Sequence, residues 1–321
     1  MQNISSKHDI IVAANNLKNI IFETPIINSL LIDDMLRMKV FFKCENLQHT
    51  GSFKFRGAFN AVSNVNLHDK KRGIVSFSSG NHGQAMSLAC KILKYDSTIL
   101  MPIDAPLIKI NGAKYYGSNV IFYNRYTDDR EKISQDIILE KGFSLISPYD
   151  NNDVISGAGT IAKEIFEKIK NIDAIMIPLG GGSLLSGCAT YIRSINSKCK
   201  IYGIEPENGN DGQISFRNKS LTKINVPNTI ADGAQTQQIG YKNFEIIKKY
   251  VDDIFTVKDS EIINAMNIIA QYSKLIVEPT GAMGLAFLLK HKEKFFHKNV
   301  VIILSGGNID INKFCQLINK N

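Results

Sequence analysis

The stretch AIMIPLGGGSLL at residues 174–185 decides the fold class of this chain. It opens with an uninterrupted apolar run, which is typical of a strand buried on both faces of a parallel sheet. Three glycines and Ser183 follow, and a segment with helical period begins at Leu184. Glycines let backbone N–H groups approach a ligand, and a helix N-terminus carries partial positive charge, so this unit suits a phosphate group. An ordinary tight turn is the alternative interpretation.

The same turn does not match the common nucleotide fingerprints. Gly180 and Gly182 fit the start of G-x-G-x-x-G, but Leu185 stands where the last glycine belongs. No Gly-Lys-Ser/Thr follows, so the P-loop pattern is absent too.

Short runs rich in Ile, Val and Phe recur along the chain and predict further buried strands. They span residues 40–43, 74–77, 98–101, 120–123, 201–204 and 300–304. Segments of helical period lie between most of them, at residues 83–93, 130–140, 161–169, 184–195 and 261–273. A capping-box spacing at Ser6 and Asp9 predicts a helix start, and Asp259 or Ser260 predicts another. This alternation indicates a parallel α/β sheet, whose ligands bind at the carboxyl ends of the strands.

Three more loops carry residues suited to chemistry. SSGNHGQ at residues 78–84 offers backbone, hydroxyl and amide donors to a carboxylate, although His82 alone could be structural. GSFKFRGA at residues 51–58 places Lys54 between two phenylalanines, where desolvation would lower the pKa of its amine and favour Schiff-base chemistry. A solvated surface lysine is the alternative. SGGN at residues 305–308 is, by itself, an ordinary glycine turn.

Composition narrows the class of protein. The 321 residues carry a formal charge of +8, but basic residues form only small groups, which argues against a nucleic-acid partner. The five cysteines are scattered without a C-x-x-C pair, as expected in a reducing compartment. No apolar run approaches the roughly 18 residues of a membrane span, and the N-terminus lacks the layout of a secretory signal. We expect a cytoplasmic protein without membrane contact.

Taken together and in order, the four loops resemble the fold-type II pyridoxal-phosphate enzymes, specifically the threonine dehydratase and serine racemase family in its short catabolic form. Further similar segments cover nearly the whole chain, at residues 23–25, 45–48, 123–131, 153–160, 230–237 and 278–282. The resemblance implies a tryptophan synthase β-like α/β fold with two open, mostly parallel sheets flanked by helices. It also implies a small domain at residues 70–146, inserted into a large cofactor-binding domain of residues 1–69 and 147–321. A homodimer is expected, and a tetramer is possible.

The resemblance also implies roles for individual residues. Lys54 would bind the aldehyde of pyridoxal 5'-phosphate covalently, and Phe53 would lie against the cofactor ring. Asn81 would contact the phenolic oxygen and Ser305 the pyridine nitrogen. The cofactor phosphate and the substrate carboxylate would each be held by a set of residues. These are Gly180, Gly181, Gly182 and Ser183 for the phosphate, where the family more often has a fourth glycine in place of Ser183, and Ser78, Ser79, Asn81 and His82 for the carboxylate.

The alcohol at position 305 bears on the chemistry. A hydroxyl cannot keep a pyridine nitrogen protonated, so the ring withdraws electrons weakly and long-lived carbanions are disfavoured. The expected reaction is β-elimination from L-threonine or L-serine, giving 2-oxobutanoate or pyruvate plus ammonia. Lys54 would take the α-proton, and Ser79 would be an acid/base on the opposite face.

The segment after residue 204 predicts a cation site. The carboxylates of Glu205 and Asp211 and the backbone carbonyl of Gly209 suit Mg²⁺ or Ca²⁺, a structural ion in similar family members. A polar exposed turn is the alternative. Only eleven residues follow Asp310, so we expect no C-terminal regulatory domain.

Several alternatives stay open. A serine racemase or a threo-3-hydroxyaspartate dehydratase would use the same scaffold. A nucleotide-binding α/β protein holding ADP or NAD at the glycine loop is a candidate of another class, and a cofactor-binding protein without catalysis is a third. Tyr149 and Gln235 are candidates for contact with the substrate side chain, and Ser147 and Ala158 for altered preference. A nucleotide effector is undetermined.

Overall fold

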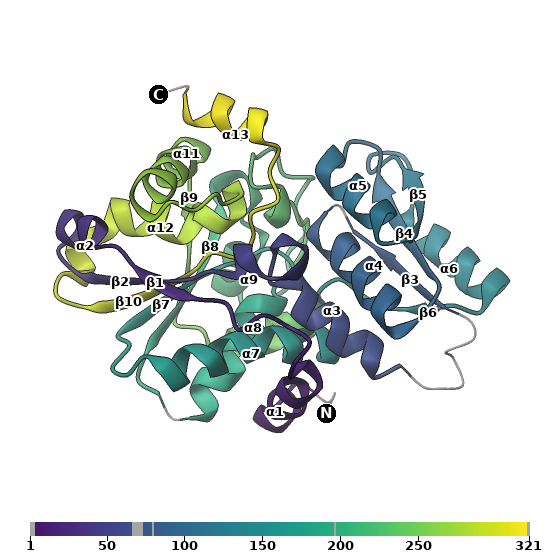
Figure 1. Ribbon diagram of the computed structural model, residues 1–321, viewed down its shortest axis with the longest axis horizontal. Helices are drawn as coiled ribbons and strands as arrows, with labels where there is room; N and C mark the ends of the chain where they lie inside the picture. The colour runs from purple at the N-terminus through teal and green to yellow at the C-terminus, as the bar shows by residue number, and fades with distance from the viewer. Residues whose placement is uncertain (1–3, 66–72, 79, 196, 320–321) are drawn as a thin grey trace.

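The computed structural model describes residues 4–65, 73–78, 80–195 and 197–319. They form a six-stranded and a four-stranded sheet that lie next to each other, each with helices on its faces (Figure 1). This is the predicted α/β architecture of two mostly parallel sheets. Residues 74–145 build the smaller sheet, and segments from both ends of the chain build the larger one. The domain boundaries at 69/70 and 146/147 stay a prediction.

The larger sheet has the strand order β1-β2-β10-β7-β8-β9 and is parallel except for the edge strand β1. Its strands are β1 (Ile26–Asn28), β2 (Lys39–Lys43), β7 (Ala174–Pro178), β8 (Lys200–Pro206), β9 (Asp253–Val257) and β10 (Asn299–Ile303). In β10, Val300 and Ile302 pack in one hydrophobic cluster and Val301 and Ile303 in another. Burial on both faces explains why these strands are continuous apolar runs in the sequence.

The smaller sheet is entirely parallel, with the order β5-β4-β3-β6. Its strands are β3 (Ile74–Phe77), β4 (Ser97–Pro102), β5 (Asn119–Tyr123) and β6 (Ser144–Leu145). All seven predicted strands are present within one or two residues at their ends. The strands β1, β6 and β9 were not predicted.

Helices cover both sheets. They are α1 (Lys7–Leu17), α2 (Leu30–Leu36), α3 (Lys54–Ser63), α4 (Asn81–Leu93), α5 (Leu107–Tyr115), α6 (Arg130–Lys141), α7 (Asn152–Lys168), α8 (Ser183–Ser194), α9 (Asp211–Asn218), α10 (Tyr241–Tyr250), α11 (Asp259–Ile268), α12 (Pro279–His291) and α13 (Ile311–Ile318). The capping box of Ser6 and Asp9 is confirmed. The predicted start at 261 is two residues late, because Lys258 is the N-cap and Asp259 is already helical.

Helix α7 corrects a larger error. It begins at Asn152, nine residues before the predicted start at 161, so the glycine-rich stretch DVISGAGT is helical. Glycine disfavours an isolated helix by about 1 kcal/mol relative to alanine, but tertiary packing overrides that preference here. A Cβ on Gly157 would stand 2.6 Å from the backbone oxygen of Arg56 in α3, and one on Gly187 of α8 would overlap with the backbone of α7. Close backbone contact therefore fixes α3 and α8 on α7, and with them the loops at their N-termini.

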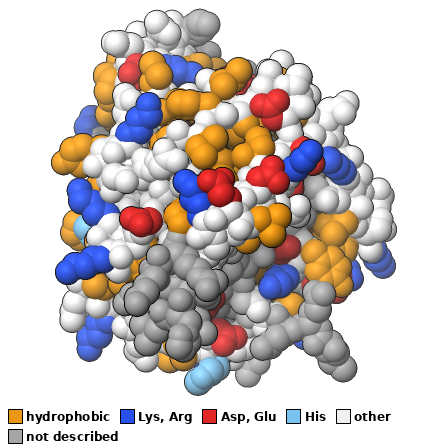
Figure 2. Space-filling model, turned by 90° about the vertical axis from the view of Figure 1, so that its right-hand side faces the viewer, with side chains coloured by type: hydrophobic (Ala, Val, Ile, Leu, Met, Phe, Trp, Pro, Cys, Tyr) orange, Lys and Arg blue, Asp and Glu red, His pale blue; other side chains and the backbone are white. Residues whose placement is uncertain are grey.

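Helix hydropathy and surface charge bear on membrane and nucleic-acid partners. In the part of the chain that the structure describes, no helix is both long enough and apolar enough to cross a bilayer. Figure 2 views the molecule from the side of the smaller sheet, and on this face Lys and Arg side chains lie scattered among acidic and uncharged ones.

Candidate active site

The glycine loop joins β7 to α8 at the carboxyl edge of the larger sheet. Gly182 has a φ of +104°, a conformation that L side chains rarely adopt, and it is the N-cap of α8. Ser183 is the first residue of the helix, so a serine in place of a fourth glycine requires no unusual backbone. Among the described residues, no side chain caps the first turn of α8, which leaves its N–H groups to face an anion.

Neighbouring groups orient this loop. The carbonyl oxygen of Gly181 accepts hydrogen bonds from the Asn243 side-chain amide at 3.0 Å and from the Gly240 N–H at 3.1 Å. A Cβ on Gly181 would collide with the ring of Tyr149, and one on Gly182 would stand 2.7 Å from Cβ of Asn243. Because hydrogen bonds fix the Gly181 carbonyl and neighbouring residues leave no space for side chains, the loop can offer its backbone N–H groups to a ligand. A phosphate-binding loop requires this arrangement.

Lys54 is the first residue of α3, so residues 54–58 of the segment that was predicted as a loop are helical. Its Nζ donates to the backbone oxygen of Pro148 at 3.1 Å and stands 5.0 Å from the centre of the Phe53 ring. Burial lowers the pKa of Lys54 to about 8, against the opposing charge of Glu278. A larger fraction of this amine than of an ordinary lysine is therefore neutral near physiological pH, and the neutral form is the one that attacks an aldehyde or takes a proton.

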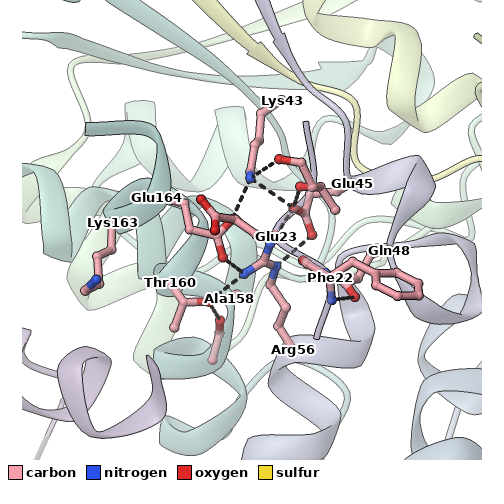
Figure 3. A network of polar contacts seen from close by, with 12 residues as sticks. Phe22, Glu23, Lys43, Glu45, Gln48, Arg56, Ala158, Thr160, Lys163 and Glu164 are labelled. Atoms are coloured by element: carbon pink, nitrogen blue, oxygen red, sulfur yellow. Dashed lines mark hydrogen bonds and ion pairs between the residues drawn. The ribbon is translucent and has the colours of Figure 1, made fainter. Parts of the chain in front are cut away.

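A buried ion network anchors α3 just beyond Lys54 (Figure 3). Arg56 donates through Nε and Nη2 to Glu45 and through Nη1 and Nη2 to Glu164, and its Nη1 also donates to Thr160. All five guanidinium N–H groups are thereby used. Lys43 completes the network with a 2.5 Å contact to Glu164. The network joins β2, α3 and α7, and so fixes the start of the helix that carries Lys54.

The network is balanced, with two positive and two negative side chains. Lys43, Glu45 and Arg56 have no accessible side-chain surface, and Glu164 retains 14%. Burial would raise the pKa of Glu164, but the charges of Arg56 and Lys43 lower it below its usual value. Glu164 therefore stays ionised within the fold, beside a guanidinium that is always charged.

The loop before α4 brings donors to the same edge from the smaller sheet. The hydroxyl of Ser78 accepts hydrogen bonds from the N–H groups of Gly80 at 3.0 Å and Gly83 at 2.8 Å, so it shapes the loop. His82 is 3% exposed, and neither ring nitrogen has a hydrogen-bond partner among the described residues. Burial and the nearby charge of Lys54 hold the pKa of His82 well below its usual value, which keeps the ring neutral.

Ser305 follows β10 and joins the Lys54 segment directly. Its backbone oxygen accepts from the N–H of Phe53 at 3.0 Å, and Ser52 pairs with Gly306 in an isolated β-bridge. The Ser305 side chain is 2% exposed, and its Oγ has no hydrogen-bond partner in the described part of the chain.

The buried polar atoms and the loops at this edge can be compared with the chemical groups of the expected cofactor, pyridoxal phosphate. Buried polar atoms without a partner cost free energy, so His82 and Ser305 point to a polar group between the loops. The glycine loop suits a phosphate, Lys54 suits an aldehyde, and a neutral hydroxyl at Ser305 suits a pyridine nitrogen. The residues present fit pyridoxal phosphate.

The predicted cation site is only partly formed by carboxylates. Glu205 accepts from the N–H groups of Gly212 at 3.0 Å and Gln213 at 2.8 Å, and Oδ2 of Asp211 is buried without a hydrogen-bond partner within the described ranges. Burial and Asp211 raise the pKa of Glu205, and burial raises the pKa of Asp211 to about 7. The described residues contain no group of three or more His, Cys, Asp or Glu side chains that could hold a metal. A cation here would need the Gly209 carbonyl and water oxygens, and it stays a proposal.

Other predicted residues differ in where they lie. Ser79 lies outside the described residues. Tyr149 packs against the glycine loop, whereas Gln235 contacts Thr229 and Arg125, and Ala158 is buried in α7. The Ser147 hydroxyl accepts from the N–H of Asp150.

The sequence analysis missed two residues that the structure brings to the site. Asn243 holds the glycine loop, and Arg130 acts on Tyr149 through its charge and a hydrogen bond. The segment YNRYTDDRE, at residues 123–131, drew attention to the neighbourhood of Arg130, but nothing local distinguishes it from a surface arginine.

Comparisons with known proteins point the same way as the site. The family model described as pyridoxal-phosphate dependent enzyme matches residues 17–306. An L-threo-3-hydroxyaspartate ammonia-lyase of Saccharomyces cerevisiae is 49% identical over 97% of this chain and 95% of that protein. A serine racemase of Schizosaccharomyces pombe is 47% identical over 97% of each chain. A catabolic L-threonine dehydratase of Staphylococcus aureus is 38% identical over 98% of this chain and 92% of that protein. The solved structure of maize serine racemase, 34% identical, matches with a TM-score of 0.93 over 99% of this chain and 98% of that one.

Proposed function

Since the chain belongs to the family of pyridoxal-phosphate-dependent enzymes and has their type II fold, we propose that it converts L-threo-3-hydroxyaspartate to oxaloacetate and ammonia. This revises the order of substrates expected from the sequence, where L-threonine and L-serine came first. The relative named for hydroxyaspartate is 49% identical and the one named for threonine 38%, which supports the revision.

The observation that carries the proposal is a cation beside the site. Arg130 stacks on the ring of Phe77 at 4.6 Å, and β3 ends there, immediately before Ser78. Burial raises the pKa of Tyr149, and the charge and hydrogen bond of Arg130 oppose that rise. Tyr149 contacts Gly181, and Lys54 donates a hydrogen bond to the backbone oxygen of Pro148. The Arg130 guanidinium therefore lies next to residues 148–149, which contact both the glycine loop and Lys54.

A second carboxylate on the substrate would account for this cation. Hydroxyaspartate carries a β-carboxylate where serine has hydrogen and threonine has a methyl group. A guanidinium binds a carboxylate through paired, charge-assisted hydrogen bonds. The ion pair of Arg130 with Glu131 is 3.2 Å long and partly exposed, so it competes weakly with a substrate.

The residues of the site then have distinct tasks. The backbone of the glycine loop holds the cofactor phosphate, and donors at the start of α4 hold the α-carboxylate. Lys54 carries the cofactor and, once released, takes the α-proton on Nζ. Ser305, as a neutral hydroxyl, would leave the pyridine nitrogen of the cofactor unprotonated, and this would favour immediate loss of the β-hydroxyl. Pyridoxal phosphate supplies the electron-accepting ring.

A substrate panel tests the proposal. The purified protein with pyridoxal phosphate is given L-threo-3-hydroxyaspartate, L-serine or L-threonine separately, and keto acid and D-serine are measured. We expect the highest kcat/KM for keto acid from hydroxyaspartate. Faster turnover of threonine, or D-serine formed faster than keto acid, would overturn this choice.

Replacing Arg130 with glutamine should separate the substrates. A hydrogen bond to a charged group contributes about 1.5–3 kcal/mol, so kcat/KM for hydroxyaspartate should fall about 10- to 100-fold. Turnover of L-serine, which has no β-carboxylate, should change little. Arg217→Gln is the control, because Arg217 is half exposed and pairs with Asp253, the first residue of β9, instead. Equal losses on both substrates in Arg130→Gln would show that Arg130 serves the fold and not the β-carboxylate.

Racemisation of serine is the second candidate, favoured by the 47% identity to a serine racemase. It requires a proton donor on the face of the substrate opposite Lys54, and Ser79 is the proposed group. Its product, D-serine, is measured in the same panel.

A further inference from the structure

The amide of Asn308 joins two of the loops that meet at Lys54. Its Nδ2 donates to the backbone oxygen of Thr50 at 2.7 Å and to Oδ1 of Asn81 at 2.9 Å. Thr50 precedes the Lys54 segment, and Asn81 is the first residue of α4. The Asn308 side chain, which follows β10, thus contacts both the segment before Lys54 in the larger sheet's part of the fold and the start of α4 in the smaller sheet's part.

The hydrogen-bond chemistry of these contacts allows only one arrangement. A backbone carbonyl such as that of Thr50 can only accept, so it fixes which atom of the Asn308 amide is the nitrogen. That nitrogen can only donate, so the atom of Asn81 facing it must be the oxygen. At its other end Asn81 donates through Nδ2 to Oε1 of Glu278 at 2.5 Å. Burial raises the pKa of Glu278, and Lys109, 3.0 Å from its other oxygen, opposes that rise and favours the carboxylate that accepts this bond.

Within the described ranges, one N–H of Asn81 remains after these contacts are counted. Its nitrogen carries two hydrogens, of which Glu278 takes one. Turning the amide over would place NH₂ against the NH₂ of Asn308 and oxygen against the carboxylate of Glu278, and both contacts would be repulsive. We infer that Asn308 is a positioning residue, which orients Asn81 so that its remaining N–H is presented to the phenolic oxygen of the cofactor. The inference rests on the proposed function, because it needs pyridoxal phosphate bound at Lys54.

A purely structural role for Asn308 is the competing explanation. Thr50 is β-branched and has a φ of +57°, a conformation that needs support from its surroundings. Asn308 supplies part of that support through the Thr50 carbonyl. The test must therefore separate an effect that passes through Asn81 from one that passes through Thr50.

The test uses Asn308→Asp, which is nearly isosteric but has no N–H to donate. The absorption spectrum of the bound cofactor is recorded at fixed pH, together with its dissociation constant. A donor at the phenolic oxygen favours its ionised form, so Asn308→Asp should lower the fraction of that form and weaken cofactor binding about tenfold. The matched control is Asn299→Asp at the start of β10, where the side-chain amide donates to the Asn171 carbonyl. Its spectrum should equal that of the wild type.

A double-variant cycle identifies the path. In protein that already carries Asn81→Ala, the change Asn308→Asp should alter neither the spectrum nor the binding further. Additive losses would overturn the inference in favour of the Thr50 tether, and so would a wild-type spectrum in Asn308→Asp. The melting temperature of the cofactor-free protein checks the fold, and Asn308→Ala replaces Asn308→Asp if the latter does not fold. A wild-type protein that binds no pyridoxal phosphate at Lys54 would instead defeat the proposed function and this inference with it.

Discussion

Replacing Lys54 with alanine is expected to abolish keto-acid formation from every substrate of the panel, with a loss of about 10³-fold or more. Two tasks disappear with the amine, the covalent link to the cofactor and the removal of the α-proton. The lowered pKa of about 8 makes this lysine, and not an ordinary surface lysine, the group suited to both. The loss should appear in kcat, since the substrate carboxylate is held by other residues.

Two controls keep this result interpretable. Lys248→Ala removes an exposed lysine that pairs with Glu245 and lies over the Phe244 ring, and it should leave turnover unchanged. The melting temperature of the cofactor-free Lys54→Ala protein should stay within a few degrees of the wild type, because Lys54 makes one hydrogen bond to a backbone oxygen. A Lys54→Ala protein with wild-type turnover would contradict the assignment.

Replacing Arg56 with leucine is expected to lower the free energy of unfolding by about 3–5 kcal/mol. The reason is the charge left behind, since Glu45 is fully buried and Glu164 nearly so, and both lose their main partner. Arg56→Lys should also destabilise the fold, because one ammonium cannot replace a guanidinium that bonds two carboxylates and Thr160. Chemical denaturation of the cofactor-free protein measures both changes.

Lys163→Leu is the matched control on the same region of Figure 3. Lys163 and Glu167 form an i,i+4 pair on the outside of α7, and pairs of this kind contribute about 0.3–0.5 kcal/mol. An Arg56→Leu protein as stable as Lys163→Leu would show that the network is not needed to hold α3.

The parts of the fold that the sequence predicted share one physical property. Strands buried on both faces are continuous apolar runs, so β7 and β10 stand out without further information. The strand β9 was missed because Asp253 and Thr256 interrupt its apolar pattern, and β6 because it has only two residues. The first half of α7 was missed because its glycines signal a turn locally, whereas their function is to let helices touch.

The candidate site divides in the same way. The glycine loop has a local signature, and the two phenylalanines beside Lys54 made it a candidate amine. The resemblance to a family supplied its covalent role and the expectation for Ser305. Arg130 and Asn243 have no local sequence signature. Each acts through a residue that is near it only in the folded chain, Arg130 through Tyr149 and Asn243 through Gly181. Preference for one β-hydroxy amino acid depends on such long-range contacts. The sequence alone therefore placed L-threonine and L-serine first, whereas the proposal that also uses Arg130 and the relatives places L-threo-3-hydroxyaspartate first.

The covalent link between pyridoxal phosphate and Lys54 is the central claim, and one measurement tests it directly. The wild-type protein is incubated with pyridoxal phosphate, reduced with borohydride, digested and analysed by mass spectrometry. We predict the reduced cofactor on the peptide that contains Lys54, with the other lysine peptides unmodified. An unmodified Lys54 peptide, with the cofactor on another lysine or on none, would contradict the account.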